Sequence, residues 1–180
     1  MTTLDVLIKL TEYTKDSIAP SILMRKEPKL TGDVMEAGEQ VEEYVNPYVT
    51  YGTVPHKNFQ PLDFQTPCIV WTFDEMEDNG DYAKGRTVNV RAYVSAYSSE
   101  IYAEGKLPDN KAFIDLVNLL EKMYIELAKK RNIKGVGIQS PVSYGIYDGA
   151  FYPYAYGWVS FTAEIPRVEY EDDFVDEYLK

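Results

Sequence analysis

The chain has 180 residues, and its 29 acidic against 18 basic residues give a formal net charge of −11 at pH 7. A hydrophobic fraction of 45% is too high for a disordered chain, and a domain of this length buries enough surface to fold without disulfides or metals. The composition predicts one soluble globular domain over residues 1–180, and its acidity argues against a surface that neutralises nucleic-acid phosphates.

The sequence contains few residues that could carry thiol or imidazole chemistry. Cys68 is the single cysteine and His56 the single histidine, so one copy can form neither a disulfide nor a Cys/His zinc site. The N-terminus lacks the basic and apolar segments of a signal peptide, which predicts a reducing, intracellular setting. No apolar run is long enough to cross a bilayer, so no membrane partner is expected.

The first predicted element is a helix over residues 3–17. Apolar residues recur there at helical spacing, and Thr2 with Asp5 has the form of a capping box. Residues 20–42 alternate proline, glycine and charge without sustained periodicity, which predicts an irregular arm.

Three strands are predicted next. Residues 43–54 are rich in Tyr and Val but are interrupted by Asn46-Pro47, which favours an edge strand. Residues 68–73 are almost wholly apolar, as in a strand covered on both faces. After a polar turn region, residues 87–97 alternate between apolar and polar side chains, which predicts a strand with one buried face.

A long central helix is predicted to open at Pro108 and Asp109. Lys129, Lys130 and Arg131 suit its C-terminal end, where the helix dipole is negative. The residues expected on its buried face are Phe113, Leu116, Val117, Leu120, Met123, Tyr124 and Leu127.

Residues 136–147 and 158–165 are predicted as two further strands joined by an aromatic loop, and an acidic tail follows at about 167–180. This order of elements predicts an α+β fold. It consists of a mainly antiparallel β-sheet with an N-terminal helix and one long central helix packed on one face.

No motif in the sequence carries a catalytic signal. The acidic turn Asp74–Asp81 resembles part of a calcium loop, but Arg86 stands where the twelfth position needs a carboxylate. A Gly-x-Gly at Gly135 follows a helix and precedes a strand, the reverse of a dinucleotide site. His56 is predicted to be a surface imidazole and Cys68 a core residue, so no catalytic residue, metal ligand or cofactor is expected.

Tyrosine is the unusual feature, since 16 of the 25 aromatic residues are tyrosines. Tyrosine joins a large contact area and a low entropy cost to a polar tip, which favours it at protein interfaces. Several tyrosines are expected in loops or on outward strand faces, and together they favour association with other proteins.

Two C-terminal motifs carry a family resemblance. The segment Asp148-Gly-Ala-Phe-Tyr-Pro-Tyr-Ala-Tyr-Gly157, followed by Phe161-Thr-Ala-Glu-Ile-Pro166, resembles the C-terminal signature of tail terminator proteins of tailed bacteriophages. Tyr51-Gly52, Pro67–Val70 and Asp115–Glu121 agree with it upstream. Relatives often carry Trp where this chain has Ala155 and Ala163.

The resemblance implies a non-enzymatic virion protein of the tail or neck, made in the host cytoplasm. Such a protein forms a ring, expected to be a hexamer, that caps the tail tube and ends its polymerisation. Its implied partners are further copies of itself, the tail tube protein and the head-tail connector or neck proteins, while DNA passes through the lumen without specific binding. Closed rings need head-to-tail contacts whose rotation closes.

Three segments are expected at the interface: an edge strand, the acidic turn and the aromatic loop. Their candidate residues are Tyr44, Tyr48, Tyr51, Asp74, Glu75, Glu77, Asp78, Asp81, Tyr152, Tyr154 and Tyr156. The alternatives are another neck component, such as a head-tail joining or tail completion protein, and an acidic non-structural adaptor or inhibitor of a host protein. An enzyme that uses carboxylates and a divalent ion is a third.

Overall fold

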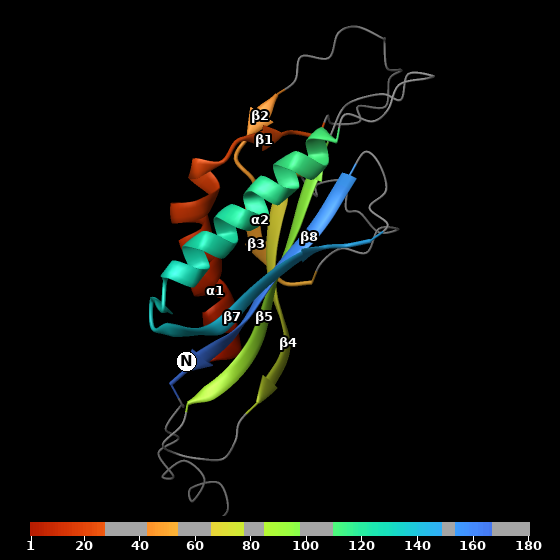
Figure 1. Cartoon of the computed structure of the whole chain (residues 1–180). Coiled ribbons are helices and arrows are strands. Elements are labelled where there is room, and N and C mark those ends of the chain that lie inside the picture. Colours follow the sequence, from red (N-terminus) through yellow and green to blue (C-terminus); the bar gives the residue numbers. More distant parts are fainter. Residues whose placement is uncertain (28–42, 54–65, 78–84, 98–109, 149–153, 167–180) are drawn as a thin grey trace, which may run out of the picture.

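Two helices and a curled six-stranded sheet form the part of the chain that the structure describes (Figure 1). This computed structural model describes residues 1–27, 43–53, 66–77, 85–97, 110–148 and 154–166. The elements in chain order are α1 (Thr3–Tyr13), the π-helical turn η1 (Thr14–Ile18), the 3-10 turn η2 (Ala19–Ser21), β1 (Met24–Arg25), β2 (Tyr44–Val45), β3 (Tyr48–Tyr51), β4 (Cys68–Glu77), β5 (Arg86–Tyr97), α2 (Lys111–Lys129), β6 (Asn132–Ile133), β7 (Val136–Ile146) and β8 (Tyr154–Ile165).

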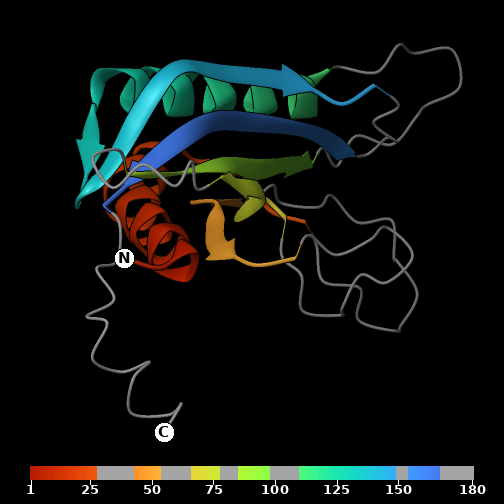
Figure 2. The same cartoon turned by 90° about the horizontal axis from the view of Figure 1, so that it is seen from below.

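The main sheet has the strand order β3-β4-β5-β8-β7-β6, and all its neighbours are antiparallel except β3 and β4. A separate two-stranded sheet joins β1 to β2. Helix α2 packs against β5, β8 and β7, and α1 packs against β3 and β4 beside it (Figures 1 and 2). The predicted α+β fold, with both helices on one face of a mainly antiparallel sheet, is therefore confirmed.

Alternation along β5 and β8 creates the face that the helices cover. Val88, Val90, Ala92, Val94 and Ala96 of β5 are buried, as predicted. The odd-numbered residues of β8 also face the helices, and at Gly157 a Cβ atom would come 2.7 Å from Leu120 Cδ1. A glycine there lets α2 approach the sheet closely.

Ala155 and Ala163, the two departures from the family resemblance, lie on this helix-covered face of β8. Both are buried, and each is paired with a buried residue of β5. A tryptophan at either position would therefore have to be accommodated in the packing beneath the helices. The two alanines are core residues of this chain and not parts of an outer surface.

Helix α1 begins with the predicted capping box. The Asp5 backbone N–H donates to Thr2 Oγ1 at 3.1 Å, and the Thr2 N–H donates to Asp5 Oδ2 at 2.7 Å, which lowers the pKa of Asp5. The predicted helix over 3–17 is regular only to Tyr13, since η1 continues it as a π-helical turn. Within η1, Thr14 Oγ1 accepts a 2.9 Å hydrogen bond from Nε1 of the fully buried Trp71.

Helix α2 buries a narrower face than the sequence predicted. Leu116, Leu120 and Leu127 are buried, but Phe113 is 48% exposed and Tyr124 is 38% exposed. Both residues lie on the flank of the helix, and the sheet reaches only the stripe centred on the leucines. The two aromatic side chains are therefore on the surface and not in the core.

The structure changes other predicted boundaries. Helix α2 starts at Lys111, and the arm predicted over 20–42 contains part of η2 and all of β1. Strand β8 begins at Tyr154, so it includes residues that were expected in a loop. Residues outside the described part include His56, Pro108, Asp109, most of the arm and the acidic tail.

Two threonines of the first helical segment test this packing. Thr14 Oγ1 bonds Trp71 and also donates to the Leu10 carbonyl at 2.7 Å, whereas the buried Thr11 Oγ1 has no hydrogen-bond partner. We expect Thr14→Val to lower the free energy of unfolding by about 1 to 3 kcal/mol, because it leaves the indole N–H unpaired. The matched change Thr11→Val should be neutral or stabilising, because it removes an unsatisfied hydroxyl. Urea denaturation of both variants measures the difference, and an equal loss in both would contradict the hydrogen-bond argument.

Candidate interface

The exposed tyrosines of β2 and β3 lie at one edge of the structure. Strand β3 pairs with β4 on one side, and no described strand pairs with its other side. Tyr48 and Tyr51 are exposed at the two ends of β3. Tyr44 is exposed on β2, where Arg25 lies 5.6 Å from the centre of its ring. Among the described residues, the edge strand predicted over 43–54 is confirmed for β3 alone, because β2 belongs to the separate two-stranded sheet, and the three tyrosines are exposed.

The first residues of the acidic segment form the end of β4. Strand β4 runs to Glu77, whereas the sequence predicted a strand that ends at residue 73. Asp74 Oδ2 forms a 2.7 Å ion pair with Arg91 Nη2, so this carboxylate is already engaged within the chain. Glu75 and Glu77 follow it as exposed residues of β4. Asp78 and Asp81 lie outside the described residues. The carboxylates of Glu75 and Glu77 are therefore the ones that β4 offers to a partner.

Tyr154 and Tyr156 belong to β8, and their rings are half-buried. The Tyr154 hydroxyl donates a hydrogen bond to Glu27 Oε1, and its ring lies 5.5 Å from that of Tyr97. Burial, together with this hydrogen bond, raises the pKa of Tyr154. Tyr152 lies outside the described residues. The hydrogen bond from Tyr154 to Glu27 thus joins β8 to the segment that follows β1. Tyr154 therefore stabilises the fold of a single copy.

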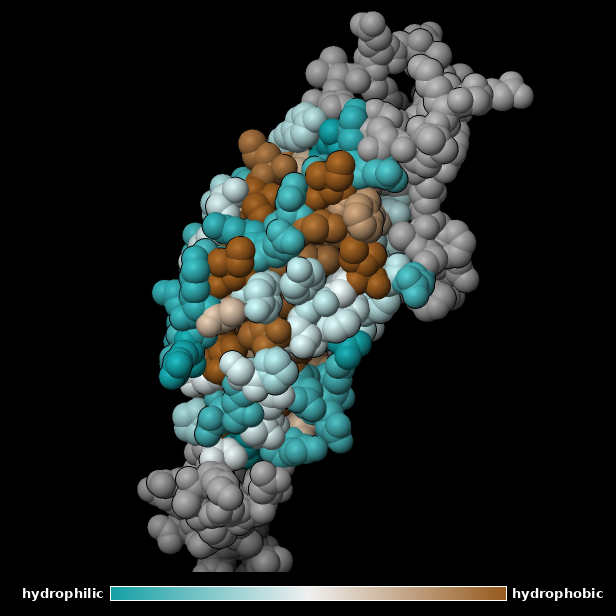
Figure 3. All heavy atoms as spheres, in the orientation of Figure 1, coloured by the Kyte–Doolittle hydropathy of each residue, from teal (hydrophilic) through white to brown (hydrophobic). Residues whose placement is uncertain are grey.

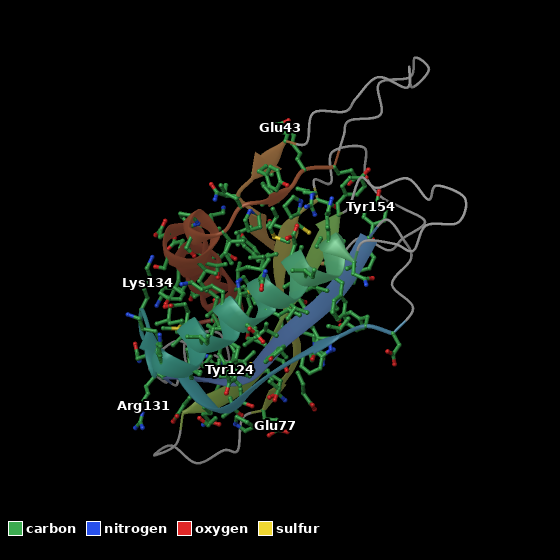
Figure 4. The ribbon with its side chains drawn as sticks, turned by 45° about the horizontal axis from the view of Figure 1, so that its top comes forward. Glu43, Glu77, Tyr124, Arg131, Lys134 and Tyr154 are labelled. Carbon is green, nitrogen blue, oxygen red and sulfur yellow. The ribbon has the colours of Figure 1, made fainter. Side chains whose placement is uncertain are left out.

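The sheet register places these segments relative to one another. Tyr48 is opposite Cys68, Cys68 is opposite Ser95, and Ser95 is opposite Tyr156. Tyr48 and the Tyr154–Tyr156 segment therefore share one end of the sheet, whereas Tyr51 is level with Val159. Glu77 lies at the other end of β4, as Figure 4 shows. Two of the three predicted segments are brought to one end, and the acidic segment is not with them.

An aromatic cluster covers part of the sheet face opposite the helices. Arg91 lies 5.6 Å from the ring centre of Trp158, and Tyr93 stacks on Tyr147 at 5.8 Å. Trp158 is paired with Gly145, where a Cβ atom would come 2.8 Å from the indole ring. Burial raises the pKa of Tyr147 to about 12. This half-buried cluster is held by its own contacts.

A second surface was missed by the sequence analysis. On the side of α2 that faces away from the core stripe, Ile114 is 52% exposed and Ile125 is 43% exposed. Phe113 and Tyr124 are exposed on the flank of the helix between these isoleucines and the core stripe. Figure 3 shows hydrophobic patches, separated by polar residues, on this side of the molecule. The members of this second surface, with the neighbouring residues of β7, are Phe113, Ile114, Tyr124, Ile125, Tyr144 and Ile146, and we call them the α2–β7 face.

The signal for this face is present in the sequence. Apolar residues on α2 cover more of the helix circumference than one sheet contact can bury. The ring of Tyr124 lies 5.5 Å from that of Tyr144, which joins the helix to the strand. Clustered exposed apolar side chains of this kind mark sites where proteins associate.

A basic segment ends the same helix. Lys129, Lys130 and Arg131 form the longest run of basic residues in the chain, and all three are exposed. Lys134 follows, and its Nζ forms a 2.7 Å ion pair with Glu12 Oε2. Figure 4 shows Arg131 and Lys134 at the end of α2, away from Tyr154.

A cavity lies among the described residues, and those residues form no cluster of metal-ligating groups. The cavity has a volume of about 480 Å³ and lies between η2 and the β2–β3 segment. Asn46 on its wall donates to the backbone carbonyls of Ala19 and Ile22, which holds the wall in place. No group of three His, Cys, Asp or Glu residues in the described part is placed to bind a metal ion.

Comparison with protein-family models finds no match to this chain, and comparison with curated proteins finds none either. Within the described residues, neither helix combines the length and the apolar character needed to span a membrane. The surfaces themselves are therefore the basis for a functional proposal.

The single thiol gives a test of the buried β4–β5 contact. Cys68 Sγ lies 3.1 Å from Ser95 Oγ, and burial raises the pKa of the thiol to about 11. Since the unfolded thiol ionises near its ordinary pKa of 9, the free energy of unfolding should fall between pH 9 and pH 11. The loss from this group is at most roughly 3 kcal/mol.

Denaturation of the wild type and of Cys68→Ala across that range measures the contribution of the thiol. The variant should lose less stability than the wild type as the pH rises. At neutral pH, iodoacetamide should label Cys68 only after denaturation. Rapid labelling of the folded protein would contradict the buried thiol.

Proposed function

We propose that the protein is a tail terminator of a tailed bacteriophage, a structural protein that forms a ring at the end of the tail tube. The ring, expected to contain six copies, ends tube polymerisation and offers the surface to which the head attaches. In this proposal no bond is made or broken, DNA passes through the ring without specific binding, and the protein is part of the virion tail or neck.

One observation carries the proposal: within the described residues, the sheet ends in a free edge on each side. At one side, β3 and the second half of β4 have no outer neighbour. At the other side, β6 pairs with the first two residues of β7 and the Ile138 N–H donates to the Arg131 carbonyl, so β7 has no described outer neighbour after Ile138. Unpaired edges invite pairing with other chains, and two different edges permit head-to-tail contacts.

The α2–β7 face supports the same proposal. Its members Tyr144 and Ile146 lie on the part of β7 that has no outer strand neighbour among the described residues, so exposed apolar side chains and unpaired backbone groups occur together there. Interfaces of stable assemblies combine such apolar contacts with hydrogen bonds at their rim. The sequence resemblance to tail terminators suggests the process in which this surface acts, which is assembly of a ring on the tail tube.

The location of the chain in the phage tests the function directly. Loss of the gene product should give tails with tubes of uncontrolled length and no attached heads, and supplying the protein should restore normal tails. Antibody labelling in electron micrographs should place it at the head-proximal end of the tube. Labelling on the head side of the connector would instead assign a head-tail joining protein, and its absence from particles would favour a non-structural adaptor.

A surface variant links the function to the α2–β7 face. The double change Ile114→Ser and Ile125→Ser alters two exposed side chains, so it should change the free energy of unfolding by about 1 kcal/mol or less. It should nevertheless reduce the number of normal tails about tenfold or more in a complementation assay. Leu23→Ser, which alters an exposed leucine outside this face, is the matched control. Normal tails from the double variant would remove the α2–β7 face from the assembly surface.

A further inference from the structure

The two lateral edges of the sheet carry opposite charges at the two ends of one row of paired residues. A single row of paired residues crosses the sheet there: Glu77 is opposite Thr87, Thr87 is opposite Glu164, Glu164 is opposite Gly137, and Gly137 is opposite Asn132. The row spans five strands, which is about 19 Å at the usual spacing between strands. It therefore has an acidic residue of β4 at one end and the β6 segment, next to Arg131, at the other.

The acidic edge is available for contact. Strand β3 pairs only with Cys68–Trp71, so the later residues of β4 have no described neighbour on their outer side. Glu75 and Glu77 are exposed there, and no described residue forms an ion pair with either. Phe73 and Met76 are exposed beside them. This edge thus combines free carboxylates with apolar side chains.

The basic edge has the matching composition. Lys129, Lys130 and Arg131 are exposed, and no described residue forms an ion pair with any of them. The apolar residues Tyr124 and Ile125 precede them on α2. Three adjacent cations without counter-ions are unexpected within a chain of net charge −11. An acidic partner surface would neutralise them.

We propose that the partner of this basic edge is the acidic β4 edge of a second copy of the chain, so that copies join head to tail. This inference rests on the proposed function, because it describes the contact from which the ring is built. Opposite edges of one sheet give a contact between two different surfaces, which is the kind that closes into a ring. Juxtaposed like charges oppose wrong pairings of acidic with acidic edges.

A zero-length carbodiimide cross-linker tests the contact, because it joins a carboxylate to an amine only when the two touch. In a mixture of ¹⁵N-labelled and unlabelled protein, mass spectrometry should find Glu75 or Glu77 joined to Lys129 or Lys130 between copies of different label. The intramolecular Glu12–Lys134 pair, 2.7 Å apart, is the internal positive control. Formation of the control cross-link without any mixed-label Glu–Lys cross-link would overturn the proposal.

Charge reversal gives an independent measurement by analytical ultracentrifugation at low salt. The variant Glu75→Lys/Glu77→Lys should weaken self-association roughly tenfold or more, and so should Lys130→Glu/Arg131→Glu. A chain that carries all four changes should recover association close to the wild type. Added salt should weaken the wild-type contact, since the Debye length falls to about 8 Å near physiological ionic strength.

The control for charge alone is Lys15→Glu/Asp148→Lys, which reverses two exposed charges elsewhere. It should leave self-association unchanged, and circular dichroism should show that every variant is folded. Unchanged association in both double reversals, no recovery in the fourfold variant, or a wild type that stays monomeric would each overturn the contact. Electrostatic self-association in a protein absent from phage tails would refute the proposed function while leaving this contact standing.

Discussion

Burial of one face of the curled sheet beneath α1 and α2 is the constraint on which the rest of the structure depends. The alternation of β5 and β8 supplies the apolar face, and Gly157 lets Leu120 come close to the sheet. Trp71 extends the same layer to η1, where Thr14 receives its indole hydrogen bond. Helix α1 also contacts the edge strands β3 and β6, and Lys134 after β6 pairs with Glu12 of α1, but among the described residues the second half of β4 and most of β7 have no outer strand neighbour.

The difference between the covered face and the unpaired strand edges explains where association with other chains is expected. A β-barrel has no free edges because its first and last strands pair. In this curled sheet the strands at the two sides, β3 and β4 on one and β7 on the other, are not neighbours in the strand order. The free edges differ in strand direction, charge and flanking side chains. A contact between them is consequently asymmetric, which suits a ring and does not suit a two-fold dimer.

The charge distribution adds information that the net charge conceals. An excess of acidic residues opposes contact with nucleic-acid phosphates and between like-charged surfaces of two copies. The basic run at the end of α2 serves the helix dipole at Lys129, but Lys130 and Arg131 lie beyond the helix. These two basic residues lie at one end of the row of paired residues, and Glu77 lies at the other end. The two sides of the sheet therefore differ in charge.

The sequence by itself determined the features whose causes are local. The capping box at Thr2, the two-residue period of β5, the continuous burial of Cys68–Trp71 and the helical stripe of α2 all follow from neighbouring residues, and each is present in the structure. The exposure of Tyr48 on an edge strand also followed, because Asn46-Pro47 limits pairing.

Only the tertiary structure decided what each surface residue does. The pairing register placed Glu77 across the sheet from Asn132, and no local pattern encodes which residues of distant strands become partners. The width of the sheet contact left Phe113 and Tyr124 exposed, and the path of the chain after β1 brought Glu27 to Tyr154. Local periodicity fixes which residues share a face of an element, whereas long-range packing fixes how much of that face is covered.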